Sequence, residues 1–211
     1  MRWGPEDWDA LIVDRARTGG HELPLAERSL LDLLGRVPGR RHMTVADLGC
    51  GSGRLLPFLS REFGEVIAVD YAPRSLALAR RASTGEGVTF RRRDLRDLAP
   101  FRNSLDVAVA VRSVVGPRPE DVDRILGEIR KALVEGGLLA AIVPASPRGT
   151  ATVPLRLAGD AAAPGLLGFH EIELQYRLRR AGFRGVRIRR FEEAGGARAA
   201  LLCTAASRAD N

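Results

Sequence analysis

Three glycines alternate with small residues directly after a short apolar run, in the segment Val45–Arg54 (Val-Ala-Asp-Leu-Gly-Cys-Gly-Ser-Gly-Arg). Gly49, Gly51 and Gly53 carry no Cβ, so a ligand can approach their backbone closely. If a helix begins after the last glycine, its unpaired N–H groups face the same ligand. The spacing predicts a ligand-binding loop between a strand and a helix, with a simple tight turn as the alternative.

A carboxylate, Asp70, ends the next apolar run, Val66–Val69. At the tip of a neighbouring strand it can accept hydrogen bonds from both hydroxyls of a ribose, and such bonds contribute about 1.5–3 kcal/mol. The glycine spacing is Gly-x-Gly-x-Gly with Asp47 two residues ahead of it. The dinucleotide fingerprint has Gly-x-Gly-x-x-Gly and an apolar residue in place of that acid. The departure favours a different adenosyl cofactor over a nicotinamide or flavin dinucleotide.

The elements that position these residues follow from an alternation of short apolar runs and amphipathic segments, which predicts βα units and a parallel sheet. The predicted strands are Thr44–Leu48, Val66–Val69, Val88–Arg91, Leu105–Val111, Leu138–Val143, Phe183–Phe191 and Arg198–Thr204. The predicted helices are Pro5–Arg17, Pro24–Leu34, Arg54–Phe63, Pro73–Ala82, Pro119–Val134 and His170–Ala181. We expect Gly136-Gly137 to end the helix before the fifth strand, Gly195-Gly196 to form a hairpin turn, and Ala205–Asn211 to be a frayed tail.

Residues 144–168 have a different composition, with four prolines, four glycines and little periodicity. This predicts an irregular insert just past the carboxyl end of the fifth strand, where open α/β sheets bind ligands. A lid or a substrate-binding segment is the expected role.

Six segments in chain order resemble the motifs of the class I S-adenosylmethionine-dependent methyltransferases, from about Leu33 to the end of the chain. They are Asp47–Gly53, Asp70-Tyr71, Arg93-Asp94-Leu95, Ser104–Val107 with Val111-Arg112-Ser113, Leu133–Gly137 and Leu178–Phe183. In the fifth segment Glu135 replaces the family's usual proline. The resemblance implies an α/β fold with a Rossmann-like seven-stranded sheet, mostly parallel with the last strand antiparallel, flanked by helices and preceded by an N-terminal helical cap.

The resemblance also implies a cofactor, S-adenosyl-L-methionine, with S-adenosyl-L-homocysteine as the product. In the family the glycine-loop backbone and the end of the fourth strand hold the methionine part, and the acids after the second and third strands hold the ribose and the adenine. The residues implied to bind the cofactor are Asp47, Gly49, Cys50, Gly51, Gly53, Asp70, Tyr71, Asp94, Leu95, Val111 and Arg112. For Asp94 the alternative is a surface acid, and Cys50 is expected to pack as a small apolar residue.

The sequence offers candidates for a catalytic base but no motif that identifies one. In such enzymes the protein aligns the acceptor with the cofactor's methyl group, and a base helps where the acceptor is a hydroxyl or a protonated nitrogen. The candidates are His170, Tyr176 and His21, with a helix-start or surface role as the alternative. His42 is expected to be exposed, and Trp8 to pack against the sheet or to close over the cofactor.

Length and composition bound the remaining possibilities. A chain of 211 residues with 45% hydrophobic content suffices for one globular domain and excludes a disordered protein. Two cysteines, Cys50 and Cys203, are too few for a disulfide framework and lack the spacing of a zinc site, so no metal is expected. With no apolar leader segment and no run of membrane-spanning length, we expect a cytoplasmic protein that does not bind membranes.

The net charge of +7 comes from 33 basic and 26 acidic residues, and every basic residue except Lys131 is an arginine. Arginine binds phosphate bidentately, so nucleic acid is a candidate partner. A solvated, lysine-poor surface is the favoured interpretation, because the arginines are dispersed and those at 177–190 fall on the far edge of the predicted sheet.

We therefore expect residues 1–36 to form the cap and residues 37–211 a methyltransferase domain with an insert at 144–170. The predicted activity is transfer of a methyl group to an O, N or C nucleophile of a small-molecule acceptor by in-line displacement. Arg112–Val115 lacks the Asn/Asp-Pro-Pro-Tyr/Phe of enzymes that methylate base amino groups or glutamine amides, and neither cysteine supports C5 pyrimidine methylation. The alternatives are an RNA or protein methyltransferase with an arginine-rich surface, a non-catalytic cofactor-binding partner subunit, and a dehydrogenase, which the glycine spacing disfavours. Monomer and homodimer both remain open.

Overall fold

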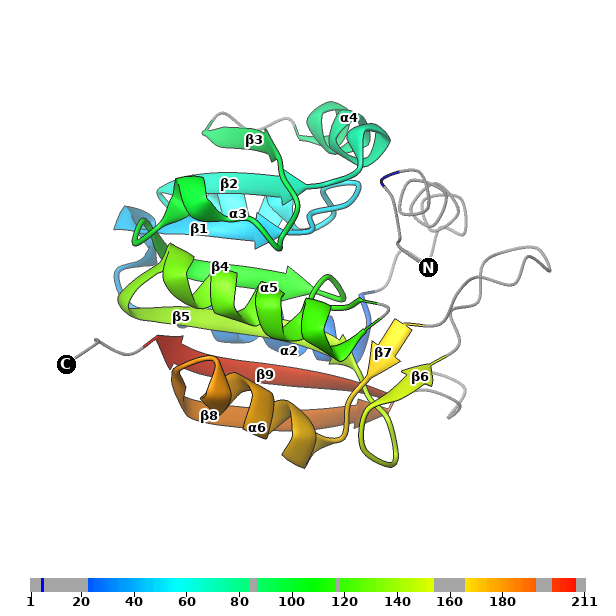
Figure 1. Ribbon diagram of the computed structural model, residues 1–211. Helices are drawn as coiled ribbons and strands as arrows, with labels where there is room; N and C mark the ends of the chain where they lie inside the picture. The colour runs from blue at the N-terminus through cyan, green and yellow to red at the C-terminus, as the bar shows by residue number, and fades with distance from the viewer. Residues whose placement is uncertain are drawn as a thin grey trace.

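In the described part of the chain, seven strands form one sheet in the order β3-β2-β1-β4-β5-β9-β8 (Figure 1). The structure, a computed structural model, describes residues 5, 23–83, 87–116, 118–153, 166–192 and 199–207. The strands of this sheet are β1 (Thr44–Leu48), β2 (Glu65–Asp70), β3 (Val88–Arg92), β4 (Leu105–Val111), β5 (Leu133–Pro144), β8 (Phe183–Glu192) and β9 (Ala199–Ser207). The helices are α2 (Leu25–Leu34), α3 (Leu56–Glu62), α4 (Pro73–Ala82), α5 (Pro119–Ala132) and α6 (Glu171–Arg180), with short 3-10 turns at Arg40–His42 and Ala99–Phe101.

The central strands are continuous apolar runs because helices cover both of their faces. In β1, Val45 pairs in parallel register with Val66 of β2 on one side and with Val107 of β4 on the other. The first five strands are parallel, and β9 runs antiparallel to both β5 and β8. The predicted sheet, with a single antiparallel strand at the end of the chain, is confirmed.

Helices α5 and α6 lie on the face of the sheet that is nearer the viewer in Figure 1, and α2 lies behind it. The residues of α2, α3 and α4 share one hydrophobic core with the back face, and those of α5 and α6 share another with the front face. Leu30 and Leu34 of α2 are fully buried in the first of these cores. The part of the predicted cap that the structure describes is thus packed against the sheet, and the boundary at residue 36 stays a prediction.

One prediction near β5 is wrong. The preceding helix ends at Ala132 rather than Val134, and the Gly136-Gly137 pair lies inside β5 instead of capping a helix. Leu133 already pairs with Leu105, and the register then shifts before Leu138 pairs with Val107. Gly136 has a φ of +73°, which glycine adopts without strain, so the Gly136-Gly137 pair allows the backbone irregularity at which the register of β5 shifts.

Two further predictions need correction. The insert is not wholly irregular, since β6 (Ala151–Val153) and β7 (Leu166–Gly168) pair as a small antiparallel sheet. Residues 205–207, expected in a frayed tail, belong to β9, because Ala205 and Ala206 pair with β5 and Ser207 is buried. The predicted helix Pro5–Arg17, the Gly195-Gly196 turn, and residues 154–165 and 208–211 lie outside the described residues, apart from residue 5.

Candidate functional site

The candidate site lies at the carboxyl ends of β1, β2 and β4, on the right of the sheet in Figure 1. After β1 the chain builds the sheet outward through β2 and β3, and it then returns to place β4 on the other side of β1. This reversal of direction at β1 is a topological switch point, and open α/β sheets bind their ligands beside the carboxyl ends of the strands at such a point.

The glycine loop after β1 is held against both neighbouring strands. The N–H groups of Gly49 and Cys50 donate to the carbonyl of Val69 at 2.7 and 2.9 Å. On the other side, a Cβ added to Gly49 would lie 2.3 Å from the Cβ of Ser113, which follows β4, and the Ser113 hydroxyl donates to the carbonyl of Leu48. Only glycine fits this contact, and its φ of +77° disfavours other residues as well.

Gly53 has a related role at the start of the following helix. A Cβ added there would lie 3.0 Å from the Cα of Ala79 on α4 and from the Cδ1 of Leu56 on α3. The glycine loop therefore packs closely on two helices, and its backbone is fixed before any ligand arrives.

Asp70, the last residue of β2, binds the backbone of the glycine loop. Its Oδ2 accepts the N–H of Gly51 at 2.8 Å, its Oδ1 accepts the N–H of Ala72 at 2.9 Å, and the residue is 6% exposed. An ionised carboxylate offers about four lone-pair directions, so one such group can accept from several donors at once. The acid predicted from the end of the second strand does reach the glycine loop.

Asp47 is a second buried acid, 2% exposed, at the end of β1. Its pKa is raised from 3.8 to about 7, first by burial and then by the negative charge of Asp70, while the positive charge of Arg54 opposes the rise. An acid that titrates near neutral pH beside a ligand loop is typical of functional sites.

Glu27 and Arg54 are neighbours of the site that the sequence reading did not single out. Arg54, directly after the glycine loop, forms an ion pair with Glu27, whose side chain is 2% exposed on α2. Glu27 lies on the same helix face as the buried Leu30 and Leu34, three and seven residues further on. An acid on the apolar face of a helix is the sequence signal that could have identified Glu27, since a buried carboxylate needs a charged or hydrogen-bonding partner.

The loop after β3 supplies Asp94 and Leu95. Leu95 is buried, and Asp94 is half-buried with its carboxylate held by Arg96. Burial opposes ionisation of Asp94, but the hydrogen bonds and charge of Arg96 outweigh it and keep the pKa of Asp94 below its usual value. Tyr71, after β2, is partly buried and accepts a hydrogen bond from Arg92 on its carbonyl at 3.2 Å.

Val111 and Arg112 end β4 on the other side of β1. The N–H of Arg112 donates to the carbonyl of Ile142 at 2.7 Å, and Arg112 has a φ of +57°. A left-handed backbone at a non-glycine residue costs of order 1–3 kcal/mol and is common where a chain turns into a ligand site.

The catalytic candidates are not brought together with these residues by any described contact. His170 caps α6, where its Nδ1 accepts the N–H of Ile172 at 3.3 Å. Tyr176 is 58% exposed on the same helix, and His42 is exposed before β1. His21 and Trp8 lie outside the described residues. Helix capping, the alternative raised for His170, is the role that its observed contact serves.

The two cysteines are buried, and burial is the main cause that raises the pKa of each thiol, to about 12 for Cys203 and beyond that for Cys50. Neither is a thiolate at neutral pH, in agreement with the packing role expected for Cys50. Within the ranges that the structure describes, no group of three or more His, Cys, Asp and Glu side chains could hold a metal ion. None of the described helices is long and apolar enough to cross a membrane.

The sheet order, the glycine loop and the acid after β2 define a Rossmann-like domain with a site for an adenosyl ligand. A family profile described as "Methyltransferase domain" matches residues 45–137, which run from β1 into β5. The demethylmenaquinone methyltransferase of Thermus thermophilus is 31% identical over 143 residues, which cover 65% of this chain and 62% of that protein. The trans-aconitate 2-methyltransferase of Mycobacterium ulcerans is 32% identical over 119 residues, covering 56% of this chain and 43% of that protein.

Among solved structures, the 1,6-didemethyltoxoflavin-N1-methyltransferase of Burkholderia thailandensis, with 1,6-didemethyltoxoflavin and S-adenosylhomocysteine bound, superposes with a TM-score of 0.74. It is 24% identical, and the match covers 97% of this chain and 87% of that one. The chain therefore carries a match to the methyltransferase domain over residues 45–137 and has the fold of S-adenosylmethionine-dependent methyltransferases. It spans less than two thirds of the length of the curated relatives named above.

Proposed function

We propose that this protein transfers a methyl group from S-adenosylmethionine to a small-molecule acceptor. The observation that carries the proposal is the hydrogen bond of Asp70, which joins the end of β2 to the Gly51 N–H at the carboxyl ends of the strands, where the strand order reverses. Glycine-loop geometry alone would suit many ligands. A buried carboxylate fixed next to it adds a site for a diol such as ribose.

The residues present fit the cofactor. Because Gly49 and Gly53 carry no Cβ, the loop backbone packs closely against Ser113, Ala79 and Leu56, and in the proposed complex the methionine part lies along this fixed backbone. In the proposed complex Asp70 accepts from the ribose hydroxyls, Tyr71 lies beside the adenine, and Asp94 accepts from its amino group with the Leu95 N–H nearby. The remaining residues assigned to this pocket are Asp47, Cys50, Gly51, Val111 and Arg112.

When bound, the cofactor supplies an electrophilic methyl group on a sulfonium sulfur. The protein's own contribution is then to hold the acceptor in line with that group and to keep water away. Such positioning can lower the activation free energy by several kcal/mol. Since His170 caps a helix and Tyr176 is exposed, we assign no general base among the described residues. The acceptor is an O, N or C nucleophile.

A small-molecule acceptor is supported by two features. The relatives named above are a demethylmenaquinone methyltransferase and a trans-aconitate 2-methyltransferase, and both names specify small molecules. In the chain itself, the insert at 144–170 starts at the carboxyl end of β5, the same end of the sheet as the glycine loop, where it can bound a small acceptor. A cytoplasmic location is part of the same proposal.

Thermal unfolding with S-adenosylmethionine, S-adenosylhomocysteine and NAD tests the cofactor. At about 100 times its dissociation constant, a ligand of the folded state stabilises by about 2.7 kcal/mol. We expect a shift with both sulfur nucleosides and none with NAD. Asp70→Asn should abolish the shift, whereas Glu135→Gln, which changes an exposed acid at the start of β5, should retain it. No shift with either sulfur nucleoside would refute the proposal.

Methyl transfer itself needs a turnover assay with a panel of small acceptors. Product formation supports the enzyme, and binding without turnover across a broad panel would favour the alternative of a non-catalytic partner subunit.

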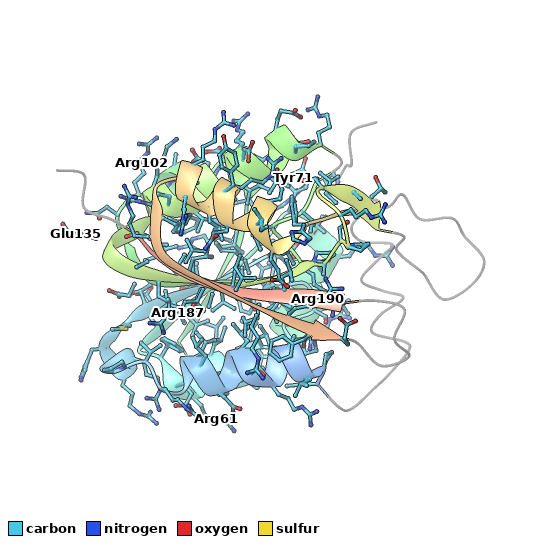
Figure 2. All side chains as sticks on the ribbon, turned by 90° about the horizontal axis from the view of Figure 1, so that it is seen from below. Arg61, Tyr71, Arg102, Glu135, Arg187 and Arg190 are labelled. Atoms are coloured by element: carbon cyan, nitrogen blue, oxygen red, sulfur yellow. The ribbon has the colours of Figure 1, made fainter. Side chains whose placement is uncertain are left out.

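RNA or protein remains the alternative acceptor class, because β8 forms an edge of the sheet and is rich in arginine (Figure 2). Arg190 pairs with Glu192 at 2.8 Å, and the Arg189 guanidinium lies 4.8 Å from the centre of the Phe191 ring. Charged side chains on an edge strand also prevent pairing with other chains. These contacts give the arginines a structural role, so the small-molecule acceptor stays the leading proposal.

A further inference from the structure

In the loop after β3, both carboxylate oxygens of Asp94 accept hydrogen bonds from Arg96. The Nε of Arg96 lies 3.0 and 3.1 Å from the two carboxylate oxygens, and its Nη2 lies 2.6 Å from Oδ2. The backbone N–H of Arg96 donates to Oδ1 at 2.9 Å. A two-pronged contact of this kind restricts the carboxylate plane as well as its position.

Arg96 also joins this loop to α5, which follows the end of β4. Its Nη1 donates to Asp121 in the first turn of α5 at 3.2 Å. Asp121 in turn accepts from Arg118 at 3.4 Å. These groups line a hollow of 280 Å³ whose wall consists entirely of charged residues: Asp94, Arg96, Asp97, Arg118, Asp121 and Arg124.

Two more contacts hold the same loop on α5. Arg124 donates to the carbonyl of Arg96 at 3.0 Å, and Glu128 accepts the N–H of Leu98 at 3.2 Å. The segment 94–98 is therefore attached to one face of α5 over two turns of the helix. The position of Asp94 depends on this attachment, with Arg96 as the link between the carboxylate and the helix.

We propose that Arg96 is a positioning residue for purine recognition, which orients the Asp94 carboxylate toward the 6-amino group of the adenine. The inference rests on the proposed function, in which Asp94 accepts from that amino group. An ionised carboxylate only accepts hydrogen bonds, so it attracts a 6-amino group and repels the 6-oxo group of hypoxanthine. A site built around one hydrogen bond rejects the analogue that lacks the donor more strongly than an apolar pocket does.

Without Arg96, the carboxylate can rotate, become hydrated and take up a proton more readily. A protonated acid can donate to a 6-oxo group, and a rotated carboxylate no longer accepts from the 6-amino group, so the preference between the two bases should shrink. A purely structural ion pair would affect the stability of the protein and leave this preference as it is.

The test compares the dissociation constants of S-adenosyl-L-homocysteine and S-inosyl-L-homocysteine, measured by calorimetry on the full chain. The wild type should prefer the adenosyl compound by at least about tenfold, the value of one lost hydrogen bond to a charged group. Arg96→Gln should reduce this preference at least about fivefold, and so should Arg96→Lys, which keeps the charge but lacks the planar fork. Arg102→Gln is the matched control, an exposed arginine on the same connection between β3 and β4, and it should keep the wild-type preference.

The outcomes separate the two proposals. If Asp94→Asn lowers the preference but both Arg96 variants keep it, the positioning role of Arg96 is overturned. If Asp94→Asn also leaves the preference unchanged, Asp94 does not read the base and this inference fails while cofactor binding stands. If the wild type binds neither compound, the proposed function itself fails. Arg96→Lys keeps the test decisive should Arg96→Gln not fold.

Discussion

Replacing the buried Asp47 by asparagine should remove a large part of the pH dependence of the protein's stability. Burial and the charge of Asp70 raise the pKa of Asp47 to about 7 in the folded protein, against an ordinary value of 3.8. Between these values the folded chain holds a proton that the unfolded chain has lost, so the free energy of unfolding falls as the pH rises. The stabilisation from this proton is complete below the ordinary pKa and is gone once the pH has passed well above 7.

The magnitude follows from the pKa in each state. At about pH 5 the folded carboxyl is almost fully protonated, and at about pH 8 it is ionised in both states. At about 1.4 kcal/mol for each pH unit, wild-type protein should lose about 2.6 kcal/mol of stability through this group across that interval. Asparagine does not titrate, so Asp47→Asn should lack this loss.

Urea unfolding of both proteins at the two pH values measures the effect, and comparing how each responds to pH isolates Asp47 from every other titrating group. Glu135→Gln serves as the control, because it removes an exposed carboxyl near the amino-terminal end of β5, at the opposite end of the strands from the site (Figure 2). It should follow the wild type. An Asp47→Asn protein that loses as much stability as the wild type between the two pH values would refute the reasoning.

Three further predictions concern the loop, the helix cap and the basic edge. Gly49→Ala should cost about 2–4 kcal/mol in urea unfolding, since its Cβ would meet Ser113 at 2.3 Å with a φ of +77°; a cost under about 1 kcal/mol would contradict that contact. His170→Ala should lose about 1 kcal/mol of stability, because the helix cap is lost, and should keep its turnover. Tyr176→Phe should also keep its turnover. Lost turnover at unchanged stability would instead indicate a catalytic role for that residue. At physiological salt we expect no RNA association in fluorescence anisotropy, and binding that weakens steeply with salt and is lost in Arg187→Glu would instead favour the nucleic-acid alternative.

The elements closest to the site could be predicted from local patterns. The bounds of β1 and β4 agree with the predicted Thr44–Leu48 and Leu105–Val111, and α4 with Pro73–Ala82. These segments succeed because an apolar run bounded by turn residues, or a helical period after a proline, is a local property of the chain. The same holds for the glycine loop and Asp70, whose roles depend on their places directly after two neighbouring strands.

Several features could not be predicted because they depend on residues far apart in the chain. The start of β5 is set by its register with Leu105, and β6 and β7 are paired across twelve intervening residues. The end of β9 extends to Ser207 because β5 pairs with Ala205 and Ala206 and β8 pairs with Ser207. Periodicity in a short window carries no information about such partners.

By itself, the sequence determined which chemistry the chain can present: a loop in which three glycines alternate with small residues, a carboxylate one strand away, and the order of strands and helices between them. Only the tertiary structure decided how these groups act on one another. The pKa of Asp47 is raised because folding buries it near Asp70, and the ion pair of Arg54 with Glu27 joins residues that are 27 positions apart. Charge and hydrogen bonding depend on distance and burial, and these exist only once the strands have come together.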